Sequence, residues 1–277
     1  VTMSAKKTVL RNSDYPDFCS CHVRDPKVWL ENGVWRMVLG ARTLDNKGCV
    51  LFYSSRDLEN WRYDGTVSTL EFGYMWECPD LLDFDGHGYL SVSPQGLEHG
   101  DMKYQNVYQS GYFRCENELK NFTEWDMGFD FYAPQTFTAP DGRRILIGWL
   151  GIGDVPYTNP TMPLGYQHCL TVPREITVDS DGSLLQNPIR ELLSLRGEKM
   201  SISDGERVET LLPFDLTAEV IGSFEITLCG ALTMSCDGKT VLSSRMYPES
   251  DKVRLTVKGL NAELFTLKEM EVSYLGE

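Results

Sequence analysis

Two carboxylates occupy sequence settings that suit acid–base chemistry. Asp25 directly follows Arg24 and precedes a proline, and a neighbouring arginine keeps an aspartate ionised. Glu77 lies in the segment YMWECPDLL, between Trp76 and Cys78. An indole and a thiol beside a carboxyl group exclude water and favour its protonated form, which suits a general acid. One charged and one protonated carboxyl group is the arrangement that glycoside hydrolysis uses.

Aromatic residues near these acids fit a sugar ligand, because the C–H faces of sugar rings stack on Trp and Tyr. Trp76, Tyr132 and Trp149 are the candidates. Ordinary explanations remain open at this point. An Asp before Pro commonly starts a turn, and a Glu next to a Trp is usually a solvated neighbour of a half-buried ring.

The elements that would position these side chains are predicted to be β-strands. Asn-Gly or Asp-Gly pairs end at residues 33, 86, 142 and 182, each between runs of β-forming residues, at intervals of 53, 56 and 40 residues. Such pairs supply the positive φ of hairpin turns. Helical periodicity is limited to PIRELLSLR, residues 188–196. Four-stranded units of about 40–50 residues indicate a β-propeller, and an irregular sandwich is the alternative.

A change in composition predicts a domain boundary near residues 196–205. All six tryptophans lie between Trp29 and Trp149, and short alternating strands follow residue 201. We therefore expect a propeller domain over residues 1–198 and a small β-sandwich over residues 199–277.

Composition excludes several classes of function. The 277 residues carry 40 acidic against 26 basic side chains, a net charge of -14, which argues against a nucleic-acid partner. No apolar run is long enough to span a membrane. The eight cysteines lack paired CxxC spacing and the four histidines are scattered. We expect no metal site, no cofactor and no disulfide framework, with free thiols in the cytoplasm.

Eight short segments in a fixed order carry a resemblance to a known family. They are HVRDPKVW, MWECPDLL, SPQG, NVYQSGY, DFYAPQTF, RRILIGWLG, HCLTVPREI and LLQNPIREL. The set resembles glycoside hydrolase family 32, the invertase, levanase and fructosidase group, over residues 16 to about 196. The resemblance implies an all-β fold with a five-bladed propeller followed by a β-sandwich. It also implies retaining hydrolysis of β-fructofuranosides such as sucrose, sucrose 6-phosphate or short β-fructans.

The same resemblance implies roles for individual residues. Glu77 would be the acid/base, and Asp25 would hold fructose hydroxyls and stabilise the transition state. Arg24 would orient the site and bind a sugar hydroxyl. The other residues expected to bind the carbohydrate are Trp76, Cys78, Asp130, Tyr132, Gln135 and Trp149.

One family motif is absent from these residues. The nucleophilic Asp of the family lies in a Trp-Met-Asn-Asp-Pro-Asn-Gly motif, which does not occur here, and Asp14 and Asp17 are expected to be ordinary loop acids. We expect that the first blade and part of the sandwich are missing, and that this chain alone is inactive. A separate N-terminal polypeptide or a second copy of the chain would cover the open blade. The alternatives are a non-catalytic carbohydrate-binding propeller and an inactive fragment of a split gene.

Overall fold

The computed structural model describes residues 5–69, 71–101, 103–219, 225–228, 232–236, 239–245, 247 and 250–271. These residues are mostly in β-strands. Short 3-10 helices occur at η1 (Asn12–Asp14), η2 (Met162–Leu164) and η3 (Arg190–Leu195). Within the segment PIRELLSLR, Arg190–Leu195 form the 3-10 helix η3, and no α-helix forms there. None of the described helices could cross a membrane.

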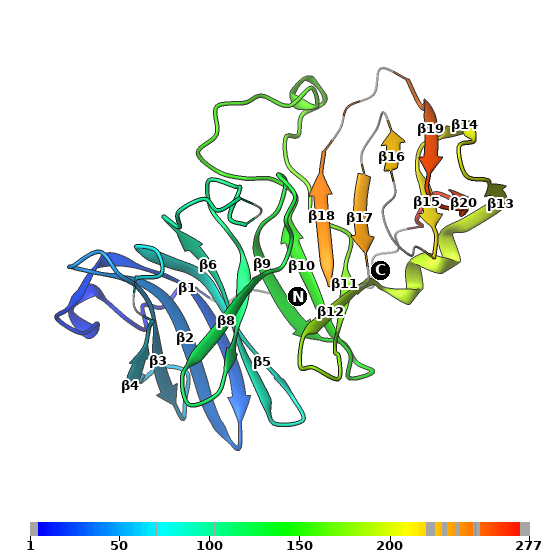
Figure 1. Cartoon of the computed structure of the whole chain (residues 1–277). Helices are drawn as coiled ribbons and strands as arrows, with labels where there is room; N and C mark the ends of the chain where they lie inside the picture. Colours follow the sequence, from blue (N-terminus) through cyan, green and yellow to red (C-terminus); the bar gives the residue numbers. More distant parts are fainter. Residues whose placement is uncertain are drawn as a thin grey trace.

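Three four-stranded antiparallel sheets follow one another along the chain (Figure 1). The first contains β1 (Cys19–Glu31), β2 (Val34–Thr43), β3 (Gly48–Ser55) and β4 (Arg62–Val67). The second contains β5 (Met75–Phe84), β6 (His87–Gln95), β7 (Gly111–Cys115) and β8 (Leu119–Glu124). The third contains β9 (Tyr132–Thr138), β10 (Arg144–Trp149), β11 (Arg174–Val178) and β12 (Leu184–Pro188). Each sheet is a meander in chain order, as a propeller blade requires.

The predicted turns explain how many blades this part of the chain builds. The turns at Gly33, Gly86 and Gly142 each join the first two strands of a sheet, whereas Gly182 joins the last two strands of the third sheet. The intervals of 53 and 56 residues thus separate blades, and the interval of 40 separates two hairpins of one blade. A five-bladed ring without its first blade would show four such sheets, and the described residues form three.

Apolar side chains fill the spaces between neighbouring sheets, and each space contains one fully buried tryptophan. Trp76 packs between the first and second sheets, and Trp125 between the second and third. Burying one large apolar side chain contributes about 1.5–3 kcal/mol. The partners of Trp76 are Val38, Val50, Leu90, Val92 and Phe113. The partners of Trp125 are Leu82, Tyr89, Tyr112, Phe131, Leu146, Ile176 and Leu184.

The remaining strands form three small sheets. β13 (Arg196–Ile202), β20 (Ala262–Leu267) and β15 (Phe214–Thr217) make one, and β14 (Arg207–Leu211), β19 (Lys252–Lys258) and β16 (Glu225–Leu228) make another. The hairpin of β17 (Leu232–Cys236) and β18 (Thr240–Ser244) lies next to the third sheet (Figure 1).

Hydrogen bonds hold this hairpin against the segment between β8 and β9. Met127 donates its backbone N–H to the Val241 carbonyl at 2.7 Å. Ser243 donates its backbone N–H to Asp126 at 2.8 Å, and Asp126 also accepts a hydrogen bond from buried Arg174 at 2.8 Å. The C-terminal strands are therefore tied to the segment that leads into β9.

Candidate active site

The first strand of every blade contains the same local irregularity. Asp25 in β1, Cys78 in β5 and Ala133 in β9 have positive φ values of 58°, 48° and 51°. Positive φ is uncommon and strained for residues other than glycine. The strand register shifts at all three positions. Such a bulge re-aims the side chains on either side of it.

A four-residue pattern marks these bulges in the sequence: Arg-Asp-Pro-Lys, Glu-Cys-Pro-Asp and Tyr-Ala-Pro-Gln. The second residue has the positive φ, and the third is always proline. Proline lacks a backbone N–H, so it is tolerated at bulges and on strands at the edge of a sheet. β1, β5 and β9 each lie at the edge of their sheet. The pattern places the first and fourth residues of three different blades at one centre.

The first residues of the three patterns converge on the carboxylate of Glu77. Arg24 donates its Nε–H to Glu77 Oε1 at 2.7 Å, and the Tyr132 hydroxyl donates to Oε2 at 2.6 Å. Gln95 in β6 donates its Nε2–H to the same Oε2 at 2.8 Å. The side chain of Glu77 is 15% exposed. Three donors from three strands therefore fix the orientation of a largely buried carboxylate.

Asp25 joins the same cluster through the residue after Glu77. The Cys78 backbone N–H donates to Asp25 Oδ2 at 3.0 Å, and the Cys78 thiol lies 3.6 Å from the same oxygen. Burial, together with the negative charges of Asp25 and Glu77, raises the pKa of the Cys78 thiol. Cys78 therefore remains a neutral donor. The structure thus brings together the two carboxylates singled out from the sequence, across 52 residues of chain.

Aromatic rings line one side of this cluster. Burial and the nearby Glu77 raise the pKa of Tyr132, which keeps its hydroxyl protonated as a donor. The Tyr132 ring lies 5.9 Å from Tyr108 and 6.5 Å from Trp149, measured between centroids. Trp149 is half-buried and donates its Nε1–H to His168 Nδ1 at 3.3 Å. Trp149 therefore neighbours Tyr132, whose hydroxyl contacts Glu77.

The fourth residues of the three patterns form a second layer. Lys27 Nζ donates to Asp80 Oδ2 and to Gln135 Oε1, each at 3.2 Å. Asp80 is 1% exposed and also accepts the Thr136 backbone N–H and hydroxyl, both at 2.7 Å. Gln135 donates its Nε2–H to the Cys78 carbonyl at 3.1 Å. Gln135 therefore supports the Glu77 strand within this layer.

The structure corrects the predicted role of Trp76 as a substrate-binding residue. Its ring is fully buried between two blades and donates to the Phe72 carbonyl at 2.7 Å. Successive side chains of a strand point to opposite faces, so Trp76 points away from the side on which Glu77 lies. The structure also corrects the expectation that Arg24 acts on the adjacent Asp25: the Arg24 side chain contacts Glu77 instead.

Asp130 is also placed differently from the prediction. It is 3% exposed and forms an ion pair with Arg245, whose Nε and backbone N–H donate to it at 2.9 Å and 2.7 Å. Asp130 therefore anchors the residue after β18 rather than lining a sugar site. The sequence analysis did not single out Arg245 or Gln95. The repeated proline pattern could have pointed to the inner strands but not to these two partners.

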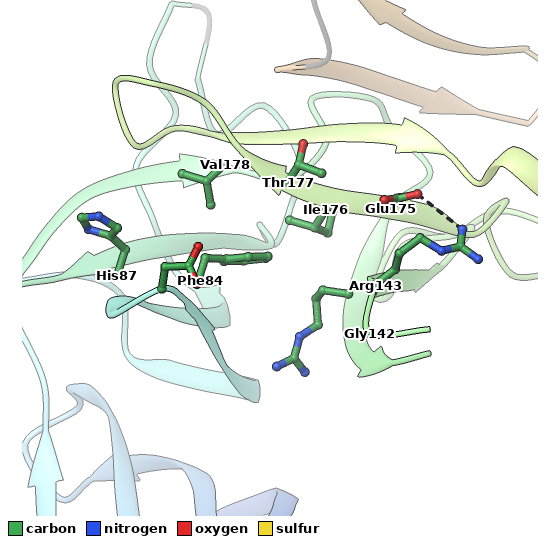
Figure 2. Close-up of a pocket in the computed structure, with 10 residues that line it drawn as sticks. Phe84, His87, Gly142, Arg143, Glu175, Ile176, Thr177 and Val178 are labelled. Atoms are coloured by element: carbon green, nitrogen blue, oxygen red, sulfur yellow. Dashed lines mark hydrogen bonds and ion pairs between the residues drawn. The ribbon is translucent and has the colours of Figure 1, made fainter. Parts of the chain in front are cut away.

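A cavity of about 440 Å³ lies at the end of the blades that carries the turns at Gly33, Gly86 and Gly142, which we call the hairpin end. We call the opposite end, near Glu77, the site end. Figure 2 shows His87 and Phe84 on one side of the cavity and Arg143, ion-paired with Glu175, on the other. The cavity contains none of the candidate catalytic residues.

The thiols and acids of the described residues give no sign of a metal centre. No group of three or more His, Cys, Asp or Glu side chains is arranged there to hold an ion. Cysteines with described side chains are free thiols, namely Cys19, Cys21, Cys49, Cys78, Cys115 and Cys169. Cys229 and the side chain of Cys236 lie outside the described part of the chain.

Comparison with known proteins identifies relatives of this arrangement. The model of the Glycosyl hydrolases family 32 N-terminal domain matches residues 1–188. A sucrose-6-phosphate hydrolase of Bacillus subtilis is 42% identical over 247 residues, covering 79% of this chain and 51% of the relative. One of Staphylococcus xylosus is 44% identical over 184 residues, covering 63% and 37%. The chain thus spans about half the length of the curated relatives it matches.

Solved structures share the fold. A Bombyx mori GH32 beta-fructofuranosidase superposes with a TM-score of 0.82 at 27% identity, covering 92% of this chain and 67% of that one. A mutant of that enzyme in complex with sucrose gives a TM-score of 0.81, again at 27% identity, with coverages of 92% and 68%.

Proposed function

The chain belongs to glycoside hydrolase family 32, and on this basis we propose that it carries the acid/base half of a β-fructofuranoside hydrolase site. The observation that carries the proposal is the contact of Arg24, Gln95 and Tyr132 with Glu77, next to Asp25 bound to the Cys78 backbone. Substrates of this class are sucrose, sucrose 6-phosphate and short β-fructans.

In this proposal Glu77 protonates the leaving-group oxygen and then takes a proton from water, as retaining glycosidases require. Asp25 accepts hydrogen bonds from fructose hydroxyls, which strengthen as positive charge develops on the sugar ring. Arg24 and Tyr132 hold Glu77 in one orientation. Trp149 offers a ring face to the sugar. Charge stabilisation by carboxylates would need neither a metal nor a cofactor.

The nucleophile is not assigned within these 277 residues, because the Trp-Met-Asn-Asp-Pro-Asn-Gly motif is absent. A retaining mechanism needs a second carboxylate about 5–5.5 Å from the acid/base, and Asp25 is assigned to the fructose hydroxyls. The chain alone should therefore hydrolyse sucrose at a negligible rate. The same absence favours the second candidate function, a propeller that binds carbohydrate without cleaving it.

Sucrose hydrolysis distinguishes these two functions. The chain is assayed alone and with a polypeptide that supplies the Asn-Asp-Pro motif from a family member. Restored turnover that Glu77→Gln abolishes supports the hydrolase. The exposed residue Glu98 provides the matched control Glu98→Gln, which should retain the restored rate. Carbohydrate binding without turnover in any mixture would favour the binding propeller.

Three further properties are part of the proposal. Residues 1–198 would form the propeller unit and residues 199–277 a second, sandwich-type unit. A cytoplasmic location fits the free thiols, which include the exposed Cys21 and Cys169. β1 presents exposed Val28 and Leu30 at the edge of its sheet. A separate N-terminal polypeptide or a second copy of the chain would cover this surface.

A further inference from the structure

The connection between β10 and β11, which we call the 150–173 loop, lies at the site end of the third blade and contacts Trp149. Its His168 accepts the Trp149 Nε1–H on Nδ1 at 3.3 Å, and the two rings meet edge to face with centroids 5.1 Å apart. Trp149 in turn neighbours Tyr132, whose hydroxyl contacts Glu77. The His168 side chain is exposed, so its position depends on how the backbone of the loop is held.

Two residues that follow β18 hold this loop at Gln167, the residue before His168. The Gln167 carbonyl accepts the Asn159 Nδ2–H at 2.7 Å and an Nη1–H of Arg245 at 3.4 Å. The Tyr247 hydroxyl donates to Asn159 Oδ1 at 3.0 Å, and Asn159 is 5% exposed. The Gln167 carbonyl is thus held directly by Arg245 and, through Asn159, by Tyr247.

Arg245 is itself buried and fixed by several partners. Its side chain is 7% exposed, and its Nη2 lies 2.8 Å from Asp130 Oδ1 and donates to the Tyr157 hydroxyl at 2.8 Å. The Tyr157 hydroxyl donates to the Ile152 carbonyl at 3.2 Å. Asp130 lies just before β9, and Ile152 just after β10. One guanidinium therefore connects the segment that enters β9 with both arms of the 150–173 loop, as its planar set of five donors allows.

These contacts form a continuous path from strands outside the blades to the candidate site. Tyr247 and its partner Asn159 are 88 residues apart in the sequence, so the path exists only when the C-terminal strands are seated on the third blade. An aromatic ring that is ordered before a ligand arrives loses less side-chain freedom on binding. A Trp149 ring held through His168 would therefore bind a sugar more tightly than an unsupported one.

We propose that Arg245 and Tyr247 are positioning residues of the carbohydrate site, which act through Gln167 and His168 to orient Trp149. This inference rests on the proposed function, in which Trp149 offers a ring face to the sugar. It gives the strands after residue 198 a part in ligand binding in addition to their packing against the third blade.

The first test is spectroscopic and needs no ligand. Tyr247→Phe removes the hydroxyl that holds Asn159, and the indole N–H resonance of Trp149, identified by its loss in Trp149→Phe, should shift in the ¹⁵N spectrum of the folded chain. His168→Ala, which removes the acceptor itself, should shift the same resonance. The matched control is Tyr63→Phe, because Tyr63 is 39% exposed against 41% for Tyr247 and its hydroxyl is also hydrogen-bonded. A loss of stability alone does not move a resonance of the folded state.

The second test is a fructose titration of the 277-residue chain, followed by ligand-observed NMR. Tyr247→Phe should bind fructose about threefold more weakly, a part of what one aromatic contact contributes, and Tyr63→Phe should bind as the unmodified chain does. Arg245→Lys keeps a positive charge for Asp130 but lacks the fork that also reaches Gln167, so it should weaken binding to a similar extent. If Arg245→Lys does not fold, Tyr247→Phe still decides.

The outcomes separate this inference from the proposed function. If the wild-type chain binds fructose, an unchanged Trp149 resonance or an unchanged affinity in Tyr247→Phe contradicts the positioning role and leaves the proposed function standing. An equal loss of affinity in Tyr63→Phe contradicts the positioning role as well, because it attributes the loss to general destabilisation. Absence of fructose binding by the folded wild-type chain contradicts the proposed function and this inference with it.

Discussion

Replacing Asp80 by alanine should destabilise the blades by about 3–5 kcal/mol, the cost of breaking a buried, hydrogen-bonded charge pair. Asp80 is 1% exposed and accepts from Lys27 and from two donors of Thr136. Its removal leaves both Thr136 donors buried without this acceptor, at about 1–3 kcal/mol each. The Lys27 side chain is 25% exposed, so part of its loss is recovered through contact with water.

Urea unfolding followed by tryptophan fluorescence measures this loss. All six tryptophans lie between Trp29 and Trp149, so the signal reports on the blades. The matched control is Asp83→Ala in the same strand, since Asp83 is exposed and accepts only a turn N–H, from Gly86 at 3.2 Å. It should cost less than about 1 kcal/mol. Equal losses for the two variants would refute the view that Asp80 ties three blades together.

Three further predictions concern packing, thiols and pH. Gly40→Ala should cost about 1–3 kcal/mol in urea unfolding, since its Cβ would lie 2.2 Å from the Trp76 carbonyl oxygen; an unchanged midpoint contradicts the close approach. Burial raises the pKa of Cys49 to about 12, so Ellman's reagent at pH 8 should label this thiol only when the chain unfolds. Rapid labelling of Cys49 in the folded chain would contradict its burial. Hydrogen bonds from the Ser183 backbone and hydroxyl, followed by one from Lys239, lower the pKa of Asp181 to about 2. This stabilisation is present above the unfolded pKa of about 3.9 and is lost as pH falls toward 2. Asp181→Asn should therefore reduce the loss of folding stability over that pH range, and a loss equal to that of the unmodified chain would contradict the prediction.

Much of the fold follows from local sequence signals. Asn32–Gly33 and Asp85–Gly86 adopt the positive φ that their hairpins require, because turn chemistry depends only on neighbouring residues. The number of blades does not follow in this way. The turns at Gly142 and Gly182 look alike in the sequence, yet both belong to the third sheet. Strand pairing, which is not local, decides the difference.

The candidate site shows the same limit. Asp25 and Glu77 could be selected from the sequence, but their partners could not be assigned from adjacency. Arg24 contacts Glu77, and Trp76 turns into the core, because neighbouring side chains of a strand diverge. Asp130 is paired with Arg245, 115 residues later in the chain. The sequence does contain the pattern of proline after the positive-φ residue, and its three copies mark the strands that converge.

Ligand-observed NMR with fructose tests most directly the claim that these residues form a β-fructofuranoside site. The folded chain should give a saturation-transfer signal for fructose, and Asp25→Asn should abolish it while leaving the urea midpoint within about 1 kcal/mol of the original stability. Asp17, an exposed acid shortly before β1, provides the control Asp17→Asn, which should bind as the unmodified chain does. A fructose signal that persists in Asp25→Asn, or no signal from the folded wild-type chain, would contradict the assignment.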